Sequence, residues 1–129
     1  MESMKNIAIK EHHLYNKAYK KGKNYVGRLV SVYVLKDYTA EQRKKANPEK
    51  KYVNRVGLSV SKKLGGAVAR NRAKRLIRAG FDVVKPNVRT GNLIVIGARA
   101  AILKNKSYDV AKELKDAFIT LGLYCDNNG

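Results

Sequence analysis

Apolar residues recur at helical spacing near the start of the chain, over residues 12–21. The spacing i, i+1, i+4, i+5 predicts a short helix with one buried stripe. Gly22 follows directly and is expected to end this helix in a left-handed conformation. The apolar positions of the stripe are Leu14, Tyr15, Ala18 and Tyr19.

A second helix is predicted near the other end of the chain, over residues 108–121. Ser107 can cap its start, and Gly122 follows its end. Its apolar stripe consists of Val110, Ala111, Leu114, Ala117, Phe118 and Leu121.

Residues 25–35 are rich in β-branched and aromatic types and predict strand, with Gly27 marking a bulge or a break into two strands. Alternation separates a core face from a half-polar face that could bind a ligand. The core face carries Val30, Val32 and Val34, and the other face carries Leu29, Ser31, Tyr33 and Leu35.

Two further strands are predicted, one over residues 52–61 and one over the continuous apolar run 92–97, which suits a strand buried on both faces. The charged segment 36–51 between the first strands is expected to be a long hairpin loop. Strand, helix and strand follow one another over residues 53–97, which predicts a crossover and parallel pairing.

The helix between those strands is basic. Its buried stripe is predicted at Ala73, Leu76, Ile77, Gly80, Phe81 and Val84, and its cationic side at Arg70, Asn71, Lys74, Arg75 and Arg78. From Lys51 to Phe81 there are nine Lys and Arg and no Asp or Glu. Like charges at i, i+4 repel, so we expect this side to bind a polyanion rather than serve only as a solvated face.

The composition supports the same interpretation. The formal net charge is +18, from 28 Lys and Arg against 10 Asp and Glu, and the 129 residues suffice for one domain. We expect a single domain over residues 1–129 that binds a polyanion, with nucleic acid as the first candidate, and that is poorly ordered at 1–11 and 124–129. No apolar run is long enough to span a membrane, and neither a signal peptide nor a disulfide partner for Cys125 is evident. These features predict a cytoplasmic protein without membrane contact.

Catalytic chemistry is not evident in the residues themselves. The acids are scattered, and the three that share the last helix, Asp109, Glu113 and Asp116, are expected to form an exposed solubilising face. His12 and His13 are adjacent, so their rings cannot converge on a metal ion or on a substrate. We therefore expect no catalytic residue and no metal site in the protein.

One uninterrupted run resembles the signature of the bacterial ribonuclease P protein subunit. The run is Gly57-Leu58-Ser59-Val60-Ser61-Lys62-Lys63, then Gly65, Ala67-Val68, Arg70-Asn71-Arg72 and Lys74-Arg75. The resemblance extends over roughly residues 12–122. It implies an α/β two-layer sandwich with about four strands, helices mainly on one face and an unusual left-handed βαβ crossover.

The resemblance also implies a function. In that family a large RNA is the catalyst and removes the 5′ leader of precursor tRNA by Mg²⁺-dependent hydrolysis, and the protein binds both the RNA and the leader. The protein itself would hold no cofactor and act as a monomer, one per RNA. Contacts to the catalytic RNA would come from Lys62, Lys63, Arg70, Asn71, Arg72, Lys74, Arg75 and Arg78. The leader cleft would consist of Tyr15, Tyr19, Arg28 and Tyr33.

Several alternatives stay open. Tyr15 and Tyr19 suit core packing of a short helix as well as stacking on RNA. A structural RNA-binding protein of ribosomal type would share the charge and the fold class, although it would not require the Arg-Asn-Arg run. A free-standing ribonuclease is disfavoured by the scattered acids. The long 36–51 loop and an N-terminal arm with only Lys5 and Lys10 depart from the family pattern.

Overall fold

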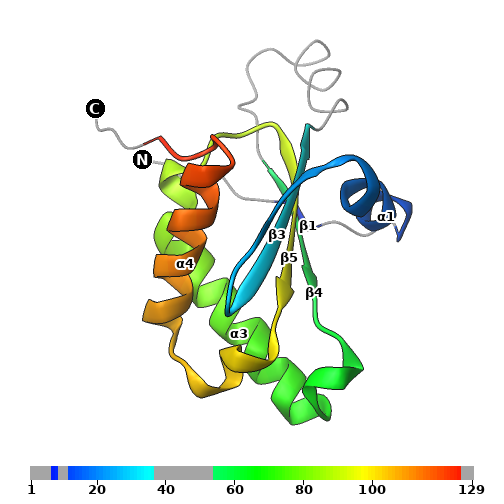
Figure 1. Ribbon diagram of the computed structural model, residues 1–129, viewed down its shortest axis with the longest axis vertical. Coiled ribbons are helices and arrows are strands. Elements are labelled where there is room, and N and C mark those ends of the chain that lie inside the picture. The colour runs from blue at the N-terminus through cyan, green and yellow to red at the C-terminus, as the bar shows by residue number, and fades with distance from the viewer. Residues whose placement is uncertain (1–6, 9–11, 37–53, 126–129) are drawn as a thin grey trace.

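The computed structural model describes residues 7–8, 12–36 and 54–125, and Figure 1 shows them as a mixed sheet with helices on both faces. The strands are β1 (Ile7–Ala8), β2 (Lys23–Val26), β3 (Val30–Lys36), β4 (Arg55–Ser59) and β5 (Asn92–Ala98). The helices are α1 (His12–Lys21), α3 (Ala67–Val84) and α4 (Ser107–Thr120), and the short 3-10 helices are η1 (Lys62–Leu64), η2 (Lys85–Asn87) and η3 (Ala100–Lys104). This order confirms the predicted class.

The strands are arranged in the order β1-β4-β5-β3-β2. β4 precedes α3 in the sequence and β5 follows it, and the two strands pair in parallel, as predicted. β3 runs antiparallel to both β5 and β2. The break expected near Gly27 separates β2 from β3, because the Gly27 N–H donates to the Val30 carbonyl at 2.9 Å and closes a turn. β1 is a fifth strand, which was not predicted. Its two residues are too few to show an alternating pattern in the sequence.

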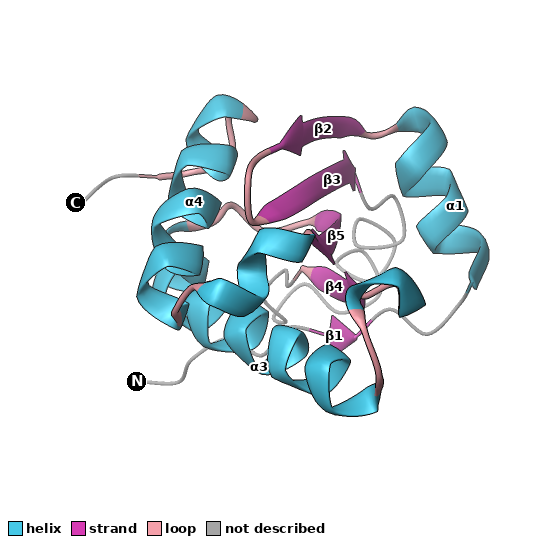
Figure 2. Cartoon of the chain, turned by 60° about the horizontal axis from the view of Figure 1, so that its bottom comes forward, coloured by secondary structure: helices cyan, strands magenta, loops and turns pink. Residues whose placement is uncertain are grey.

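The helices form two unequal layers. Figures 1 and 2 show α3 and α4 side by side on one face of the sheet and α1 alone on the other. The larger core lies under α3 and α4, and a smaller one lies under α1. β5 serves both, since Ile94 and Ile96 belong to the larger core and Leu93 and Val95 to the smaller. The prediction that this strand is buried on both faces is confirmed.

The predicted stripe of α3 faces the larger core, with Leu76 half-buried at its margin and the other five residues buried. Gly80 allows the close packing of α3 against α4. A Cβ at this position would lie 2.8 Å from Val110 Cγ1 and 3.0 Å from the Ala111 nitrogen. The two helices are therefore as near as a glycine permits.

The helix ends differ in part from the prediction. Gly122 has φ 79° and ends α4 in the left-handed conformation expected of it, but Gly22 does not have positive φ. A Cβ at Gly22 would lie 2.7 Å from the Val34 carbonyl oxygen, so this glycine permits a close approach to β3 instead.

Ser107 is the first residue of α4 and not its cap. The preceding residue is Lys106, whose backbone N–H donates to the Asp109 carboxylate at 3.0 Å, while the Asp109 N–H donates to the Lys106 carbonyl at 3.0 Å. A carboxylate in the first turn satisfies a free N–H and complements the helix dipole, so Asp109 and not Ser107 fixes this end.

Two places within the terminal segments that were expected to be poorly ordered pair with the rest of the fold. Ile7 and Ala8 pair with β4, and near the other end Tyr124 forms an antiparallel bridge to Val88. The Cys125 N–H donates to the Asn87 carbonyl at 2.6 Å. The remainder of both terminal predictions, and the 36–51 loop beyond Lys36, lie outside the described residues. In the part of the chain that the structure describes, no helix has both the length and the apolar character to cross a membrane.

Candidate nucleic-acid interface

A short structured segment joins β4 to α3. The Ser61 hydroxyl accepts a hydrogen bond from the Lys63 N–H at 3.1 Å, and η1 then runs into Gly65, which has φ 143°. A residue with a side chain rarely adopts that conformation, so the glycine sets the direction in which α3 begins. Lys62 and Lys63 are both exposed at this corner.

The cations of α3 are mostly exposed and carry no acidic neighbour. The first turn of α3 contains no acid, and the ion pair in its last part joins Asp82 to Lys85 at 3.1 Å. Among the described residues, none of the proposed RNA contacts forms an ion pair. The exposed ones are Lys62, Lys63, Asn71, Arg72, Arg75 and Arg78, and Lys74 is half-buried.

Arg70 is not on the exposed side of α3, where it was predicted. It is half-buried, and its Nε is a buried nitrogen without a hydrogen-bond partner among the described residues. The reason is its position, since Arg70 precedes Ala73 by three residues and Ile77 by seven, which places it at the start of the buried stripe. Its guanidinium is thus less free to reach a ligand than that of Arg72.

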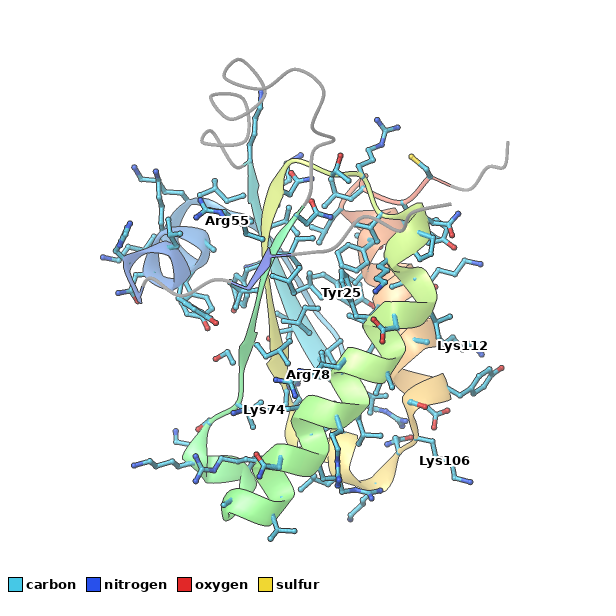
Figure 3. The ribbon with its side chains drawn as sticks, turned by 180° about the vertical axis from the view of Figure 1, so that it is seen from behind. Tyr25, Arg55, Lys74, Arg78, Lys106 and Lys112 are labelled. Carbon is cyan, nitrogen blue, oxygen red and sulfur yellow. The ribbon has the colours of Figure 1, made fainter. Side chains whose placement is uncertain are left out.

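The cations occupy two flanks of α3. Figure 3 shows Lys74 and Arg78 on the flank of α3 toward β4, away from α4. Two residues of a helix turn by about 200°, so Arg72 emerges from the opposite flank to Lys74. A polyanion that contacts both flanks must therefore lie across the N-terminal half of α3.

Three of the four residues predicted for the leader cleft come together under α1. The rings of Tyr19 and Tyr33 meet edge to face, with centroids 4.8 Å apart and an interplanar angle of 86°. Tyr15 and Tyr33 are half-buried beside the smaller core, whereas Tyr19 is 39% exposed. We call Tyr15, Tyr19 and Tyr33 the tyrosine cluster.

Tyr15 is fixed in place by β4. A Cβ at Gly57 would overlap the Tyr15 hydroxyl, so the glycine makes the space that the ring occupies. Burial raises the pKa of the Tyr15 hydroxyl, as does the nearby Tyr19, and a hydrogen bond with the Leu58 backbone acts in the opposite direction.

Small residues continue the sheet face next to the tyrosine cluster. In the register of the sheet, Tyr33 lies opposite Val95, and the next row on that face joins Ser31, Gly97 and Ser59. A Cβ at Gly97 would lie 2.7 Å from the Ser31 Oγ, so the absence of a side chain at Gly97 leaves room for this hydroxyl. The predicted half-polar face is confirmed for Tyr33 and Leu35, which pack beside the smaller core, and is wrong for Leu29. Leu29 precedes β3 and is buried in the larger core, so it does not follow the alternation of that strand.

Arg28 lies apart from the tyrosine cluster, in the turn between β2 and β3. The pairing of Val30 with Ala98 and of Ser59 with Gly97 brings this turn to the same end of the sheet as η1 and the start of α3. Arg99, which follows β5 and is exposed, lies at that end too, because its N–H donates to the Leu29 carbonyl at 2.9 Å. We call Arg28, Lys62, Lys63 and Arg99 the basic edge.

Arg99 was not predicted from the sequence, because a single cation after a buried strand is no part of a helical charge pattern.

The prediction for the acidic residues of α4 was wrong in part. Asp109 caps α4, and the Glu113 carboxylate accepts backbone N–H groups of the β2–β3 turn, so Asp116 alone of the three is fully exposed. Among the described residues, no three His, Cys, Asp or Glu side chains gather in a way that could hold a metal ion.

The sequence profile of the family described as Ribonuclease P matches residues 4–122. The chain belongs to the ribonuclease P protein family. The ribonuclease P protein component of Clostridium acetobutylicum is 35% identical over 120 residues, covering 93% of this chain and 92% of that protein. The corresponding protein of Listeria innocua is 34% identical over 110 residues, covering 85% of this chain and 83% of its own length.

Solved ribonuclease P proteins have the same fold. The Staphylococcus aureus RNase P protein superposes with a TM-score of 0.71 at 30% identity, covering 94% of this chain and 100% of that one. The RNase P protein of Thermotoga maritima, at 23% identity and a TM-score of 0.62, agrees in fold. Membership of the ribonuclease P family makes this chain a subunit of a bacterial endoribonuclease that processes tRNA, with ribonuclease P RNA as its partner.

Proposed function

We propose that the chain binds ribonuclease P RNA through α3 and the 5′ leader of precursor tRNA through the tyrosine cluster, and so promotes metal-dependent removal of the leader. The observation that carries this proposal is the exposed set of α3 cations, which have no ion-pair partner among the described residues. A chain that keeps these charges unneutralised has a ready site for a polyanion.

We call Arg72, Lys74, Arg75 and Arg78 the α3 surface. It suits an RNA backbone better than a protein partner. Arg is more frequent than Lys on this helix, and its planar guanidinium matches two phosphate oxygens at once. The contacts proposed from the sequence remain Lys62, Lys63, Arg70, Asn71, Arg72, Lys74, Arg75 and Arg78. We expect Arg70 to contribute least, because its Nε is buried.

The tyrosine cluster suits a single strand of varied sequence. Every base has a flat face, so stacking on an aromatic ring tolerates any base and contributes roughly 1–3 kcal/mol per base. Tyr19 has the most exposed ring of the three, and the hydroxyls of Ser31 and Ser59 lie in the next row of the sheet. Arg28 would contact the leader or the RNA from the basic edge.

Bond cleavage is assigned to the RNA. We propose that the RNA holds the metal ions of the reaction; among the described residues, no three His, Cys, Asp or Glu side chains gather in a way that could hold one. The role of the protein is then to increase affinity for the substrate. We propose a monomer, one per RNA, acting in the bacterial cytoplasm.

The experiment is reconstitution of the full chain with a bacterial ribonuclease P RNA and precursor tRNA at low magnesium. The expected result is faster cleavage at the mature 5′ end than with the RNA alone. Binding to the RNA without faster cleavage would favour a purely structural RNA-binding role. Cleavage of precursor tRNA by the protein alone would show that an active site has been overlooked.

A further inference from the structure

Glu113 lies in the middle of α4, and its carboxylate reaches the turn between β2 and β3. The N–H groups of Leu29 and Val30 donate to Oε2 at 2.8 and 2.7 Å, and the Arg28 N–H donates to Oε1 at 3.2 Å. A Cβ at Gly27 would lie 2.5 Å from Oε2, so the turn fits the carboxylate only with glycine there. One side chain thus fixes the backbone of residues 27–30.

These hydrogen bonds leave the side chain of Arg28 free. Both oxygens of Glu113 accept backbone N–H groups, and among the described residues the Arg28 guanidinium has no ion pair. Hydrogen bonds to a carboxylate are stronger than those between neutral groups, so the main chain at Arg28 is held firmly. A cation with a fixed backbone loses less conformational freedom when it binds a phosphate.

The turn is also tied to the rest of the basic edge. The Arg99 N–H donates to the Leu29 carbonyl at 2.9 Å, which joins the turn to the chain leaving β5. The register of β3, β5 and β4 places Lys62 and Lys63 at the same end of the sheet. The basic edge therefore lies where the α3 surface meets the sheet face next to the tyrosine cluster.

We propose that Glu113 is a positioning residue for RNA binding, which holds Arg28 at the basic edge so that its guanidinium contacts an RNA phosphate. This inference rests on the proposed function. In this inference an acidic side chain is required for binding a polyanion, although an acid is ordinarily expected to weaken such binding by charge repulsion. If Glu113 acted only through its charge, removing it would raise the affinity for RNA.

The test measures the affinity of the full chain for ribonuclease P RNA over a range of salt concentrations. The variants are Glu113→Gln, Arg28→Ala and the double variant, and Asp116→Asn is the matched control. Asp116 is exposed on the same helix and makes no hydrogen bond or ion pair with the described residues. Circular dichroism of each variant checks that it is folded at the temperature of measurement.

The expected result is that Glu113→Gln lowers the affinity about three- to tenfold, although the net charge rises by one. It should also reduce the slope of log affinity against log salt by about one, as Arg28→Ala does. The double variant should bind as well as Arg28→Ala alone, because both changes remove the same contact. Asp116→Asn should leave the affinity unchanged or raise it slightly.

A second variant keeps the inference testable if Glu113→Gln does not fold. Gly27→Ala pushes against the carboxylate from the side of the turn, and we expect the same loss of affinity and of salt slope. Additive losses in the double variant, or a gain in affinity like that of Asp116→Asn, would overturn the inference while RNA binding by the unaltered chain stands. Failure of the unaltered chain to bind the RNA would overturn the proposed function and this inference together.

Discussion

Tyr15 and Tyr19 lie one helical turn apart on α1 and have different neighbours. Tyr15 is fixed between the smaller core and Gly57, and burial raises the pKa of its hydroxyl. Tyr19 keeps 39% of its surface exposed, and its ring meets that of Tyr33 edge to face. Tyr15 therefore suits core packing better than Tyr19 does, and we propose Tyr19 as the residue of this pair that stacks on a base.

We predict that Tyr19→Ala lowers the affinity of the reconstituted enzyme for precursor tRNA by roughly five- to a hundredfold, the equivalent of one stacked base. Tyr19→Phe should keep most of the affinity, because the stacking surface remains. Binding assays with precursor tRNA would measure both variants. Mature tRNA, which has no leader, is the control, and an equal loss for both substrates would place Tyr19 outside the leader site.

Single residues also limit what the sequence could predict. Arg70 was assigned to the exposed side because it is charged, although its spacing from Ala73 and Ile77 places it at the start of the buried stripe. Glu113 was interpreted as a solubilising acid because its partners are backbone N–H groups 83 to 85 residues away in the chain. Contacts of this kind leave no local pattern, so sequence periodicity does not reveal them.

Among the elements, α3 combines two roles on one helix. Its buried stripe packs on the sheet and on α4, and its exposed flanks carry the cations. The stripe was predictable, because apolar or small residues that recur at 3.6-residue spacing are typical of the buried face of a helix. The helix against which this stripe packs was not predictable. Position 80 shows why, because a glycine is required there by Val110, which lies on α4.

We predict that Gly80→Ala destabilises the protein even though alanine favours helix. The added methyl would overlap Val110 and the backbone of Ala111, and overpacking of this kind costs about 1–3 kcal/mol in the free energy of unfolding. Urea denaturation followed by circular dichroism measures the change. Ala79→Ser, at the neighbouring exposed position, should change the stability by less than about 0.5 kcal/mol. A more stable Gly80→Ala variant would mean that α3 and α4 can separate without cost.

For the molecule as a whole, the net charge is +18, and the cations proposed to bind RNA lie in two neighbouring regions. The α3 surface and the basic edge meet at one end of the sheet, and the tyrosine cluster lies on the opposite face from α3. A single RNA partner can therefore be held at the end of the sheet while a flexible strand passes over the face under α1. Affinity for the RNA should come mainly from phosphate contacts and depend strongly on salt.

We predict that the affinity for ribonuclease P RNA falls by about 10³-fold or more between 50 and 200 mM salt, as expected for six to ten phosphate contacts. Arg72→Ala combined with Arg75→Ala should reduce the slope of log affinity against log salt by about two. Lys85→Ala is the control, because Lys85 already pairs with Asp82 at 3.1 Å. An unchanged slope in the double variant would exclude these two arginines from the RNA contact.

The central place of β5 has a consequence for how the protein is made. Both hydrophobic cores need side chains of this strand, and it begins at Asn92, after α1 and the whole of α3. A nascent chain therefore carries all the cations of α3 out of the ribosome before either core can close. Until β5 emerges, neither core can be completed, so we expect this non-local pairing to delay folding to a late stage of synthesis, while the α3 cations are exposed beside ribosomal RNA.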